Sequence, residues 1–437
     1  MNEWKKVKIG DVCKIIKGAT GIASAEPGEY PLVVTAVERK TCSLFQFDCE
    51  AVCIPLVSSS GHGKKSLNNV HYQKGKFALG TILCAVIPND SNELDARFLR
   101  QYLLFYKDTI LVPLMKGAAN VSLSMKDIAK VEIPLPSIEK QHELSELFVE
   151  TQKKYKELLE ESEKQKSYVK QLRQNILQEA IEGKLTEEWR KENPVVKGNP
   201  DFDAEALFEK IQEEKCHTDS ELLRNSKKKV FEPIAENEQP FEIPEGWKWV
   251  RLGEVSRING GYSFKSAEYT ESGIRVIRIS DFNENGFVNS KIVRYEDSDV
   301  IKPYHLEEKN ILMALTGGTV GKSFFVTSIN ESMAVNQRVA TIKIDYSKPE
   351  YVNILVKSST TQRMIHKAKH STNDNISLPD LVNMLLPLPP LSEQKEIVSR
   401  VEKLLANVTE LEKQIAELET LTKQMLQSIM KDAFREE

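Results

Sequence analysis

The feature that most constrains this sequence is a long heptad pattern that occurs twice in one register, 253 residues apart. Its positions alternate at spacings of 4 and 3 residues, which is typical of long helices that pack along one seam. The second copy comprises Ile397, Val401, Leu404, Val408, Leu411, Ile415, Leu418, Thr422, Met425 and Ile429. The first copy comprises Leu144, Phe148, Thr151, Tyr155, Leu158, Ser162, Gln165, Val169, Leu172 and Ile176. The pattern predicts two matching long helices.

The repeat extends beyond the helices, which indicates duplication of a whole structural unit. Each half opens on a tryptophan and an apolar segment, ends its globular part with Asn-Val/Ile-Ser-Leu, and enters its helix through prolines. The matching segments are residues 4–12 and 247–255, 120–123 and 375–378, and 133–136 and 386–389. The middle of each half has diverged. We therefore expect one fold, built twice.

These signals predict an α+β fold with two mixed α/β domains, each followed by a long helix. Ser137 and Ser392 follow the proline-rich steps and are predicted to cap the two helices. Gly183 is expected to end the first helix, which at about 45 residues and 1.5 Å per residue would be roughly 65 to 70 Å long. The expected segments are a domain at 1–136, a helix at 137–186, an acidic linker at 187–246, a domain at 247–390 and a helix at 391–437.

Within the domains, apolar runs predict strands at 275–280, 311–316 and 335–344, and helices at 97–106 and 351–365. One short helix is predicted in the linker, at 203–215.

Three arrangements are open to the long helices. Each could pack on its own domain, two chains could form a zipper, or the two helices could pair within one chain. Intramolecular pairing is favoured, because the two seams share one register and the linker is long enough to permit it. Polar Ser162 and Gln165 on the seam indicate that helices of a partner also pack here.

The charge distribution is compatible with nucleic-acid binding by both domains. Residues 1–136 carry a net charge of +4 and residues 247–390 carry +3, whereas residues 192–246 carry −7.

A length of 437 residues allows two to four domains. No signal sequence or membrane-spanning apolar run is evident, so a cytoplasmic protein is expected. The six cysteines are read as reduced thiols, with no metal site.

Enzyme motifs appear only in part. Residues 316–323 resemble a phosphate-binding loop, but Thr316 stands where the first glycine is required and an apolar strand follows Lys322. A partial nuclease motif at 200–215 lies in the charged linker, away from the strands such a site needs. No methyltransferase tetrapeptide is present. The sequence therefore predicts no catalytic residue and no cofactor in this chain.

What remains are glycine-rich and basic loops suited to DNA. Lys and Arg can contact phosphates or read guanine, and Asn and Gln can read adenine. Asn336 and Gln337 lie beside a predicted strand, so a structural role is favoured for them. The candidate DNA contacts are His62, Lys64, Lys65, Lys116, Asn120, Tyr262, Lys265, Thr316, Thr319, Lys322 and Arg338.

Several motifs resemble those of the specificity subunit of type I restriction-modification systems. They are the segment LRQNILQEAIEGKLT at 172–186, the helix entries LPSIEKQ at 135–141 and LPPLSEQ at 388–394, and IPEGW at 243–247. The resemblance covers essentially the whole chain. It implies two target recognition domains, each followed by a spacer helix, with the two helices paired antiparallel.

The resemblance also implies a function: recognition of a bipartite asymmetric DNA site, one half-site per domain, with a helical ruler setting the spacer. Two modification subunits would dock on the helices, and restriction subunits would join them. S-adenosylmethionine, ATP and Mg²⁺ would be bound by those partners. The first domain has the loop at 61–66 in place of the Thr-Gly-Gly-Thr hairpin, so the half-sites should differ. The alternative is a coiled-coil adaptor that does not read DNA.

Overall fold

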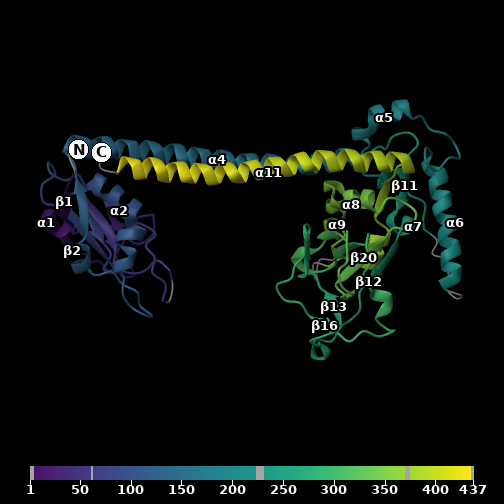
Figure 1. Ribbon diagram of the computed structural model, residues 1–437, viewed down its shortest axis with the longest axis horizontal. Helices are drawn as coiled ribbons and strands as arrows, with labels where there is room; N and C mark the ends of the chain where they lie inside the picture. The colour runs from purple at the N-terminus through teal and green to yellow at the C-terminus, as the bar shows by residue number, and fades with distance from the viewer. Residues whose placement is uncertain (1–3, 61–62, 223–230, 370–374, 435–437) are drawn as a thin grey trace. The chain divides into compact units, whose positions relative to one another are not determined.

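The computed structural model describes residues 4–60, 63–222, 231–369 and 375–434. The chain divides into two compact units (Figure 1). The first unit comprises residues 1–164 and 415–437, and the second comprises residues 165–414. Each unit therefore contains one globular domain and a part of both long helices.

The first domain is built from two four-stranded sheets, ordered β2-β9-β6-β7 and β4-β3-β8-β5, and a β1-β10 pair. Helix α2 packs over β6 and β7. The strands are β1 (Lys5–Lys8), β2 (Cys13–Lys17), β3 (Tyr30–Val33), β4 (Lys40–Cys42), β5 (Phe47–Asp48), β6 (Ala51–Pro55), β7 (His71–Gln73), β8 (Lys76–Leu79), β9 (Leu83–Pro88) and β10 (Glu132–Leu135), and the helices are α1 (Ile9–Val12), α2 (Ala96–Ile110) and α3 (Met125–Ile128).

The second domain has sheets ordered β12-β20-β17-β18 and β16-β13-β19, with β11-β21 and β14-β15 pairs. The strands are β11 (Lys248–Arg251), β12 (Arg257–Gly260), β13 (Ile274–Ile277), β14 (Phe282–Asn283), β15 (Gly286–Phe287), β16 (Arg294–Tyr295), β17 (Ile311–Ala314), β18 (Ser323–Phe325), β19 (Met333–Val335), β20 (Val339–Lys343) and β21 (Leu385–Leu388), and the helices are α7 (Leu252–Val255), α8 (Pro349–Lys357), α9 (Ser359–Lys367) and α10 (Leu378–Val382).

The two domains share one topology, including the part where their sequences have diverged. The four-stranded sheet β2-β9-β6-β7 corresponds to β12-β20-β17-β18, and the parallel pair β3-β8 corresponds to β13-β19. The β6–β7 loop, of which residues 56–60 and 63–70 are described, therefore corresponds in topology to the Thr-Gly-Gly-Thr segment between β17 and β18. The two loops are equivalent in position although they differ in length and sequence.

Two predicted elements are interrupted in the structure. The strand predicted at 335–344 is divided into β19 and β20 by a turn at 336–338. The helix predicted at 351–365 is divided into α8 and α9 at Ser358, whose hydroxyl accepts a hydrogen bond from the Thr361 amide and so caps α9. Both breaks lie within continuous apolar patterns, and local hydrogen bonding decides them.

The long helices are α4 (Ile138–Ile181) and α11 (Leu391–Ala433). Ser137 caps α4 by accepting a hydrogen bond from the Lys140 amide at 3.4 Å, as predicted. Gly183 has a φ of 72°, the left-handed conformation expected at the end of α4. The prediction for Ser392 is wrong: α11 already begins at Leu391, because the Pro390 carbonyl accepts the first helical bond, from the Gln394 amide.

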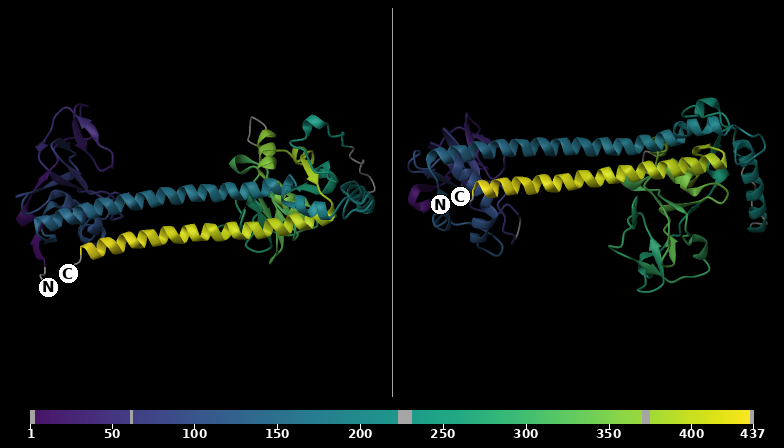
Figure 2. Two further views of the ribbon diagram at one scale, coloured as in Figure 1. Left: turned by 90° about the horizontal axis from the view of Figure 1, so that it is seen from above. Right: turned by 45° about the horizontal axis from the view of Figure 1, so that its top comes forward.

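Within each unit α4 and α11 lie side by side and run antiparallel (Figures 1 and 2). In the first unit Ser162 Oγ donates to Glu419 Oε1 at 2.6 Å, and Phe148 shares a core with Met430 and Phe434 near the end of α11. In the second unit the Arg173 guanidinium contacts Glu412 at 3.0 Å. Intramolecular pairing, favoured from the sequence, is thus present in both units.

Only one of the two heptad rows is buried along the middle of these helices. Buried positions with 0–8% exposure recur at intervals of seven or fourteen residues or lie near the helix starts, whereas five apolar positions of the other row are 42–63% exposed. The buried positions are Leu144, Phe148, Ser162, Val169, Ile176, Ile397, Val401, Val408 and Ile415. The exposed ones are Leu158, Leu172, Leu411, Leu418 and Met425, while Tyr155, Leu404 and Ile429 are half-buried. Pairing of the two helices therefore buries only one of the two apolar rows that form the predicted seam.

A buried glutamine joins each long helix to the domain before it. Gln141 Oε1 accepts from the Asp95 amide at 2.8 Å, and its Nε2 donates to the carbonyls of Glu93 and Pro136. At the equivalent position in the second half, Gln394 accepts from the Lys348 amide at 3.0 Å. Both side chains are fully buried.

The segment expected to be a linker is partly folded onto the second domain. It contains α5 (Glu187–Glu192) and α6 (Ala204–Leu222), which is longer than the predicted helix. Leu207 and Ile211 of α6 are buried, and Lys215 Nζ donates to the Gly253 carbonyl at 2.7 Å. The connector thus adds to the second unit.

Glu393, at the start of α11, is a second junction in this unit. Its carboxylate accepts from Thr186 Oγ1 at 2.6 Å, from Trp247 Nε1 at 2.7 Å and from the Arg190 guanidinium. The side chain is 98% buried, so these bonds compensate its lost hydration. They tie the segment after α4 and the start of the second domain to α11.

Candidate nucleic-acid interface

In the first domain, two of the predicted binding loops lie side by side. The amide of Ser58, at the start of the β6–β7 loop, donates to the Val121 carbonyl at 3.0 Å, which joins this loop to the segment 116–122. Lys64 and Lys65 are exposed on the loop, and hydroxyls of Ser58 and Ser60 hold its two sides together. His62 lies outside the described residues.

Lys116 and Asn120 project from the neighbouring segment, and both are exposed. The Lys116 ammonium lies 3.1 Å from a carboxylate oxygen of Asp127 and, together with the Ser124 hydroxyl, lowers the pKa of that carboxyl. The side chain of Lys116 is 77% exposed, so this pair is screened by water and can be exchanged for a phosphate. These two side chains therefore share a polar surface with Lys64 and Lys65.

In the second domain, three predicted loops converge at one edge of the sheets. The Tyr262 amide donates to the Val335 carbonyl at 2.8 Å, and the Tyr262 carbonyl accepts from the Gln337 amide at 2.9 Å. The Leu315 amide donates to the Arg338 carbonyl at 3.0 Å. These backbone bonds place the loops at 260–265, 315–322 and 336–338 together.

At this convergence the side chains of Gln337 and Arg338 are exposed beside a shallow hollow of about 290 Å³. Arg278, which also lines the hollow, is held by two bonds to Asp281 at 2.7 and 2.8 Å. Asn336 Oδ1 accepts from the Arg338 amide, which favours the structural role expected for Asn336. A structural role was also expected for Gln337; its backbone is hydrogen-bonded, and its side chain is exposed.

Three more candidates surround this edge. Tyr262 is half-buried, with its ring 5.0 Å from that of Phe264, and Lys265 is exposed and pairs with Glu268 at 3.1 Å. Thr319, which is exposed, donates to the Thr316 carbonyl at 3.2 Å and so stabilises the Thr-Gly-Gly-Thr turn. Aromatic and hydroxyl groups beside an Arg and a Gln form a surface able to contact both bases and phosphates.

Lys322 is placed differently from the other candidates. Its ammonium donates to the Ile279 carbonyl and lies 4.7 Å from the centre of the Phe282 ring. Burial lowers the pKa of this lysine. Because its charge is directed into the domain, the geometry favours a structural role over the phosphate contact suggested by the sequence.

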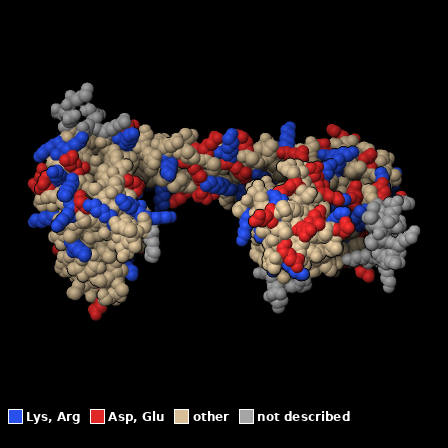
Figure 3. Space-filling view, turned by 60° about the horizontal axis from the view of Figure 1, so that its bottom comes forward, with Lys and Arg blue, Asp and Glu red and all other residues tan. Residues whose placement is uncertain are grey.

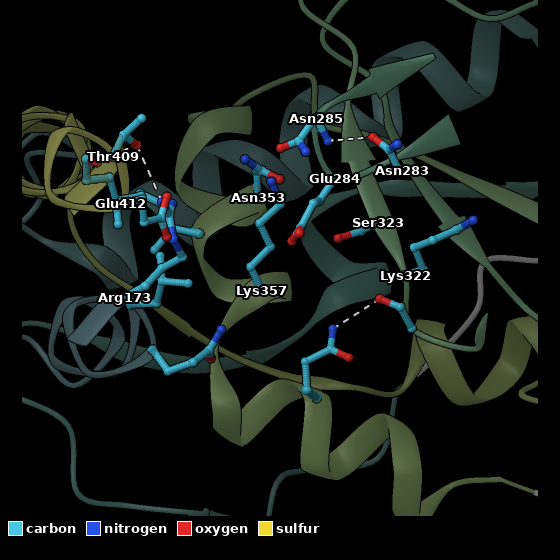
Figure 4. Close-up of a pocket in the computed structure, with 16 residues that line it drawn as sticks. Arg173, Asn283, Glu284, Asn285, Lys322, Ser323, Asn353, Lys357, Thr409 and Glu412 are labelled. Carbon is cyan, nitrogen blue, oxygen red and sulfur yellow. Dashed lines mark hydrogen bonds and ion pairs between the residues drawn. The ribbon is translucent and has the colours of Figure 1, made fainter. Parts of the chain in front are cut away.

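A polar cavity of about 710 Å³ lies in the second unit between α8, the β14–β15 hairpin and the paired helices (Figure 4). Lys357, Asn353 and Glu284 point into it. Burial lowers the pKa of Lys357, and Asn353 Oδ1 is buried without a hydrogen-bond partner. No sequence motif marks this cavity, because its lining comes from separate elements.

Figure 3 shows how charged side chains are distributed on one face of each domain. Lys and Arg gather over the upper part of the visible face of the first domain, whose lower part is mostly uncharged, and the visible face of the second domain mixes both signs. Among the described residues no group of three His, Cys, Asp or Glu side chains could hold a metal, and no helix is long and apolar enough to cross a membrane.

The structure thus defines a class of protein with a duplicated α+β domain, exposed basic and amide side chains on its loops, and a long helix after each domain. The chain belongs to the family of type I restriction modification DNA specificity domains, whose model matches residues 1–170 and 244–420. This confirms the resemblance inferred from the sequence.

Relatives of known name are specificity subunits of type I restriction enzymes. The EcoAI subunit of Escherichia coli is 31% identical over 249 residues, which cover 55% of this chain and 40% of that protein. The EcoDI subunit of Escherichia coli is 22% identical over 456 residues, covering all of this chain and 88% of the relative. The chain thus matches less than half the length of some relatives and most of others.

Two solved structures share the fold along the whole chain. A chain from a study of complex assembly and conformational transition of the type I R-M system matches with a TM-score of 0.64 and 17% identity, covering 100% of this chain and 98% of that one. The HsdS subunit from Thermoanaerobacter tengcongensis matches with a TM-score of 0.57 and 17% identity, covering 100% and 97%. The fold expected from the sequence is thereby confirmed.

Proposed function

We propose that this chain is the DNA-recognition subunit of a type I restriction-modification complex and reads a bipartite asymmetric site. The main support for the proposal is the duplicated topology: the two domains have the same sheets, but the loops at the equivalent sheet edge differ in sequence. In the second domain this edge presents Tyr262, Gln337 and Arg338, and in the first it presents Lys64, Lys65 and Lys116. One fold with two sets of loop side chains suits two unlike half-sites.

The roles within this surface follow from side-chain chemistry. Arg338 and Gln337 are the proposed base-reading pair, since Arg contacts guanine and Gln contacts adenine through two hydrogen bonds. Lys64, Lys65, Lys116 and Lys265 are proposed to contact phosphates, which orients the domain without reading sequence. Asn120, Thr316 and Thr319 are proposed as additional polar contacts.

The chain is proposed to supply specificity while its partners supply the chemistry. Two modification subunits would bind S-adenosylmethionine and methylate the site, and restriction subunits would use ATP and Mg²⁺. The exposed heptad row of Leu158, Leu172, Leu411, Leu418 and Met425 supports docking of partner helices, because these apolar side chains are left open in the isolated chain. Such a role agrees with the cytoplasmic location expected from the sequence.

The test is to express the chain with its modification subunits and map the methylated bases in DNA of random sequence. The expected result is two short defined half-sites separated by a spacer of fixed length and free sequence. The matched variant Arg338→Gln should alter or relax one half-site and leave the other unchanged. A single continuous site, or no sequence-dependent methylation at all, would favour the adaptor alternative.

A further inference from the structure

In the first domain, two arginines and a histidine gather where β7 meets α2, at the end of the β6–β7 loop. Arg39 lies in the β3–β4 loop, His71 begins β7, and Arg100 lies on α2. Burial is the first cause that lowers the pKa of both arginines, and their mutual repulsion lowers that of Arg100 further. Two positive charges are thus partly desolvated together.

Among the described residues no carboxylate neutralises this pair. Glu50, which bonds Tyr72 next to His71 in the chain, is engaged by the Lys74 ammonium at 2.6 Å and by the Tyr72 hydroxyl at 2.8 Å. His71 adds no negative charge, and its own pKa is lowered to about 4, chiefly by burial, so it is neutral at physiological pH. Arg39 and Arg100 are only partly buried, and no nitrogen of Arg100 is among the buried atoms without a partner, so its guanidinium remains open to solvent and to an anion.

The guanidinium groups of Arg39 and Arg100 differ in how many of their N–H groups already donate hydrogen bonds within the domain. Arg39 is used by the fold, since it bonds Gln73 Oε1, His71 Nδ1 and the carbonyls of Val37 and Tyr72. Arg100 makes one bond, from Nε to the Val70 carbonyl at 3.0 Å. Its two terminal nitrogens find no acceptor among the described residues, so the fork that binds carboxylates and phosphates is free.

The position of this cluster connects it to DNA. Val70 and His71 end the β6–β7 loop, which carries Lys64 and Lys65, and Asn69 of this loop bonds the Thr35 carbonyl at 2.9 Å. An anion bound by Arg100 would therefore lie at the base of a loop already proposed to approach DNA. A phosphodiester is the anion that such a loop would bring.

The second half has a cavity at the equivalent place. Gln141 bonds the Asp95 amide just before α2, and Gln394 bonds the Lys348 amide just before α8, so α2 and α8 are equivalent helices. When the two halves are aligned at these amides, Arg100 of α2 corresponds to Asn353 of α8. Asn353 lines the 710 Å³ cavity of Figure 4, together with the Lys357 side chain. Both halves therefore have a polar side chain at this helix position, Arg100 in the first and Asn353 in the second, whereas a core position would be apolar.

We propose that Arg100, supported by Arg39, binds a backbone phosphate of the half-site read by the first domain. The role is to position the domain, and it carries no base specificity. This inference rests on the proposed function, because it assumes that the first domain binds DNA.

The test compares Arg100→Gln with the unchanged chain, each in complex with its modification subunits, on a duplex carrying the mapped site. Losing one phosphate contact should reduce the slope of log affinity against log salt concentration by about 0.9 and weaken binding by about tenfold or more. A scan with single uncharged methylphosphonates should find one position that weakens the unchanged complex and not the variant. Arg100→Lys should retain the slope while losing part of the affinity.

The control is Lys8→Gln, which removes one exposed positive charge from β1 of the same domain. If Arg100→Gln leaves slope and affinity unchanged, or if Lys8→Gln has an equal effect, the site is refuted. A changed methylated sequence would also refute it, since that would mean base reading. If inorganic phosphate protects the unchanged chain against heat through Arg100 while DNA binding does not depend on Arg100, the ligand is a free anion. If the unchanged complex binds no DNA, the proposed function itself fails.

Discussion

Each of two buried glutamines joins the start of a long helix to the domain before it through hydrogen bonds of one side chain. Gln141 bonds one amide and two carbonyls, of which the bond to the Pro136 carbonyl is buried, and Gln394 repeats the arrangement with the Lys348 amide and the Pro389 carbonyl. Both occur at the same position after a Leu-Pro step, so this contact is part of the duplicated unit.

We predict that Gln141→Leu destabilises the first unit by about 2 to 5 kcal/mol, because unpaired buried backbone groups cost about 1 to 3 kcal/mol each. Denaturant unfolding measures the loss, and hydrogen exchange should show faster exchange of the amide at Asp95. Gln152→Leu, at an exposed position on the same helix, is the matched control and should change stability by less than about 0.5 kcal/mol. Equal effects of the two variants would contradict this assignment.

His71 makes the stability of the first unit depend on pH. Burial, and then the two neighbouring arginines, lower its pKa from 6.5 to about 4 in the folded protein. The unfolded chain therefore binds the proton more tightly, so stability is complete above about pH 6.5 and falls as the pH is lowered toward 4, by about 3 kcal/mol. Unfolding titrations in denaturant between pH 7 and 4 measure this dependence.

The variant His71→Gln keeps a hydrogen-bond acceptor for Arg39 and cannot titrate, so its pH dependence should be shallower. His366→Gln changes an exposed histidine of α9 and should leave the profile as it is. Identical profiles for His71→Gln and the unchanged chain would exclude His71 as the cause.

At the scale of elements, the paired helices α4 and α11 leave one apolar row exposed, as two helices of a larger helical bundle would. Each heptad supplies two apolar positions, but a two-helix contact buries one of them along the middle of α4 and α11. The exposed row is too regular to be scattered surface residues, because it repeats on both helices at multiples of seven. We propose that helices of a partner bury this row.

The double variant Leu418→Gln and Met425→Gln is predicted to weaken association with the modification subunits at least tenfold. Both side chains are exposed in the isolated chain, so its unfolding free energy should change by less than about 1 kcal/mol. The matched control is Val408→Gln, from the buried row, which should destabilise the chain itself. Unchanged association, measured by titration of purified subunits, would place the partner surface elsewhere.

At the scale of the whole molecule, α4 and α11 each contribute residues to both units, so their length is proposed to set the DNA spacer. Inserting one heptad into each helix keeps both seams in register and adds about 10.5 Å, or about 3 base pairs at 3.4 Å each. Mapping of methylated sites should then show a spacer longer by that amount. An unchanged spacer, with methylation intact, would refute a helical ruler.

Much of this architecture follows from local sequence signals. The repeat predicted two domains of one fold, the heptads predicted the helices, and Ser137 and Gly183 marked the ends of α4, because caps and apolar periodicity act over a few residues. The candidate loops also came from local composition. Ser392, the continuous helix at 351–365 and the inward position of Lys322 were missed, because competing hydrogen bonds decide them.

The sequence by itself determined the duplication, the helices and the family, since these are recorded in periodicity and short motifs. Only the tertiary structure decided that one heptad row stays exposed, that Gln337 presents its side chain beside Arg338, and that Arg39 and Arg100 share a site where the described residues supply no acid. The reason is that each depends on contacts between residues far apart in the chain. Arg39 and Arg100 are 61 residues apart, and neither stands in a recognisable motif.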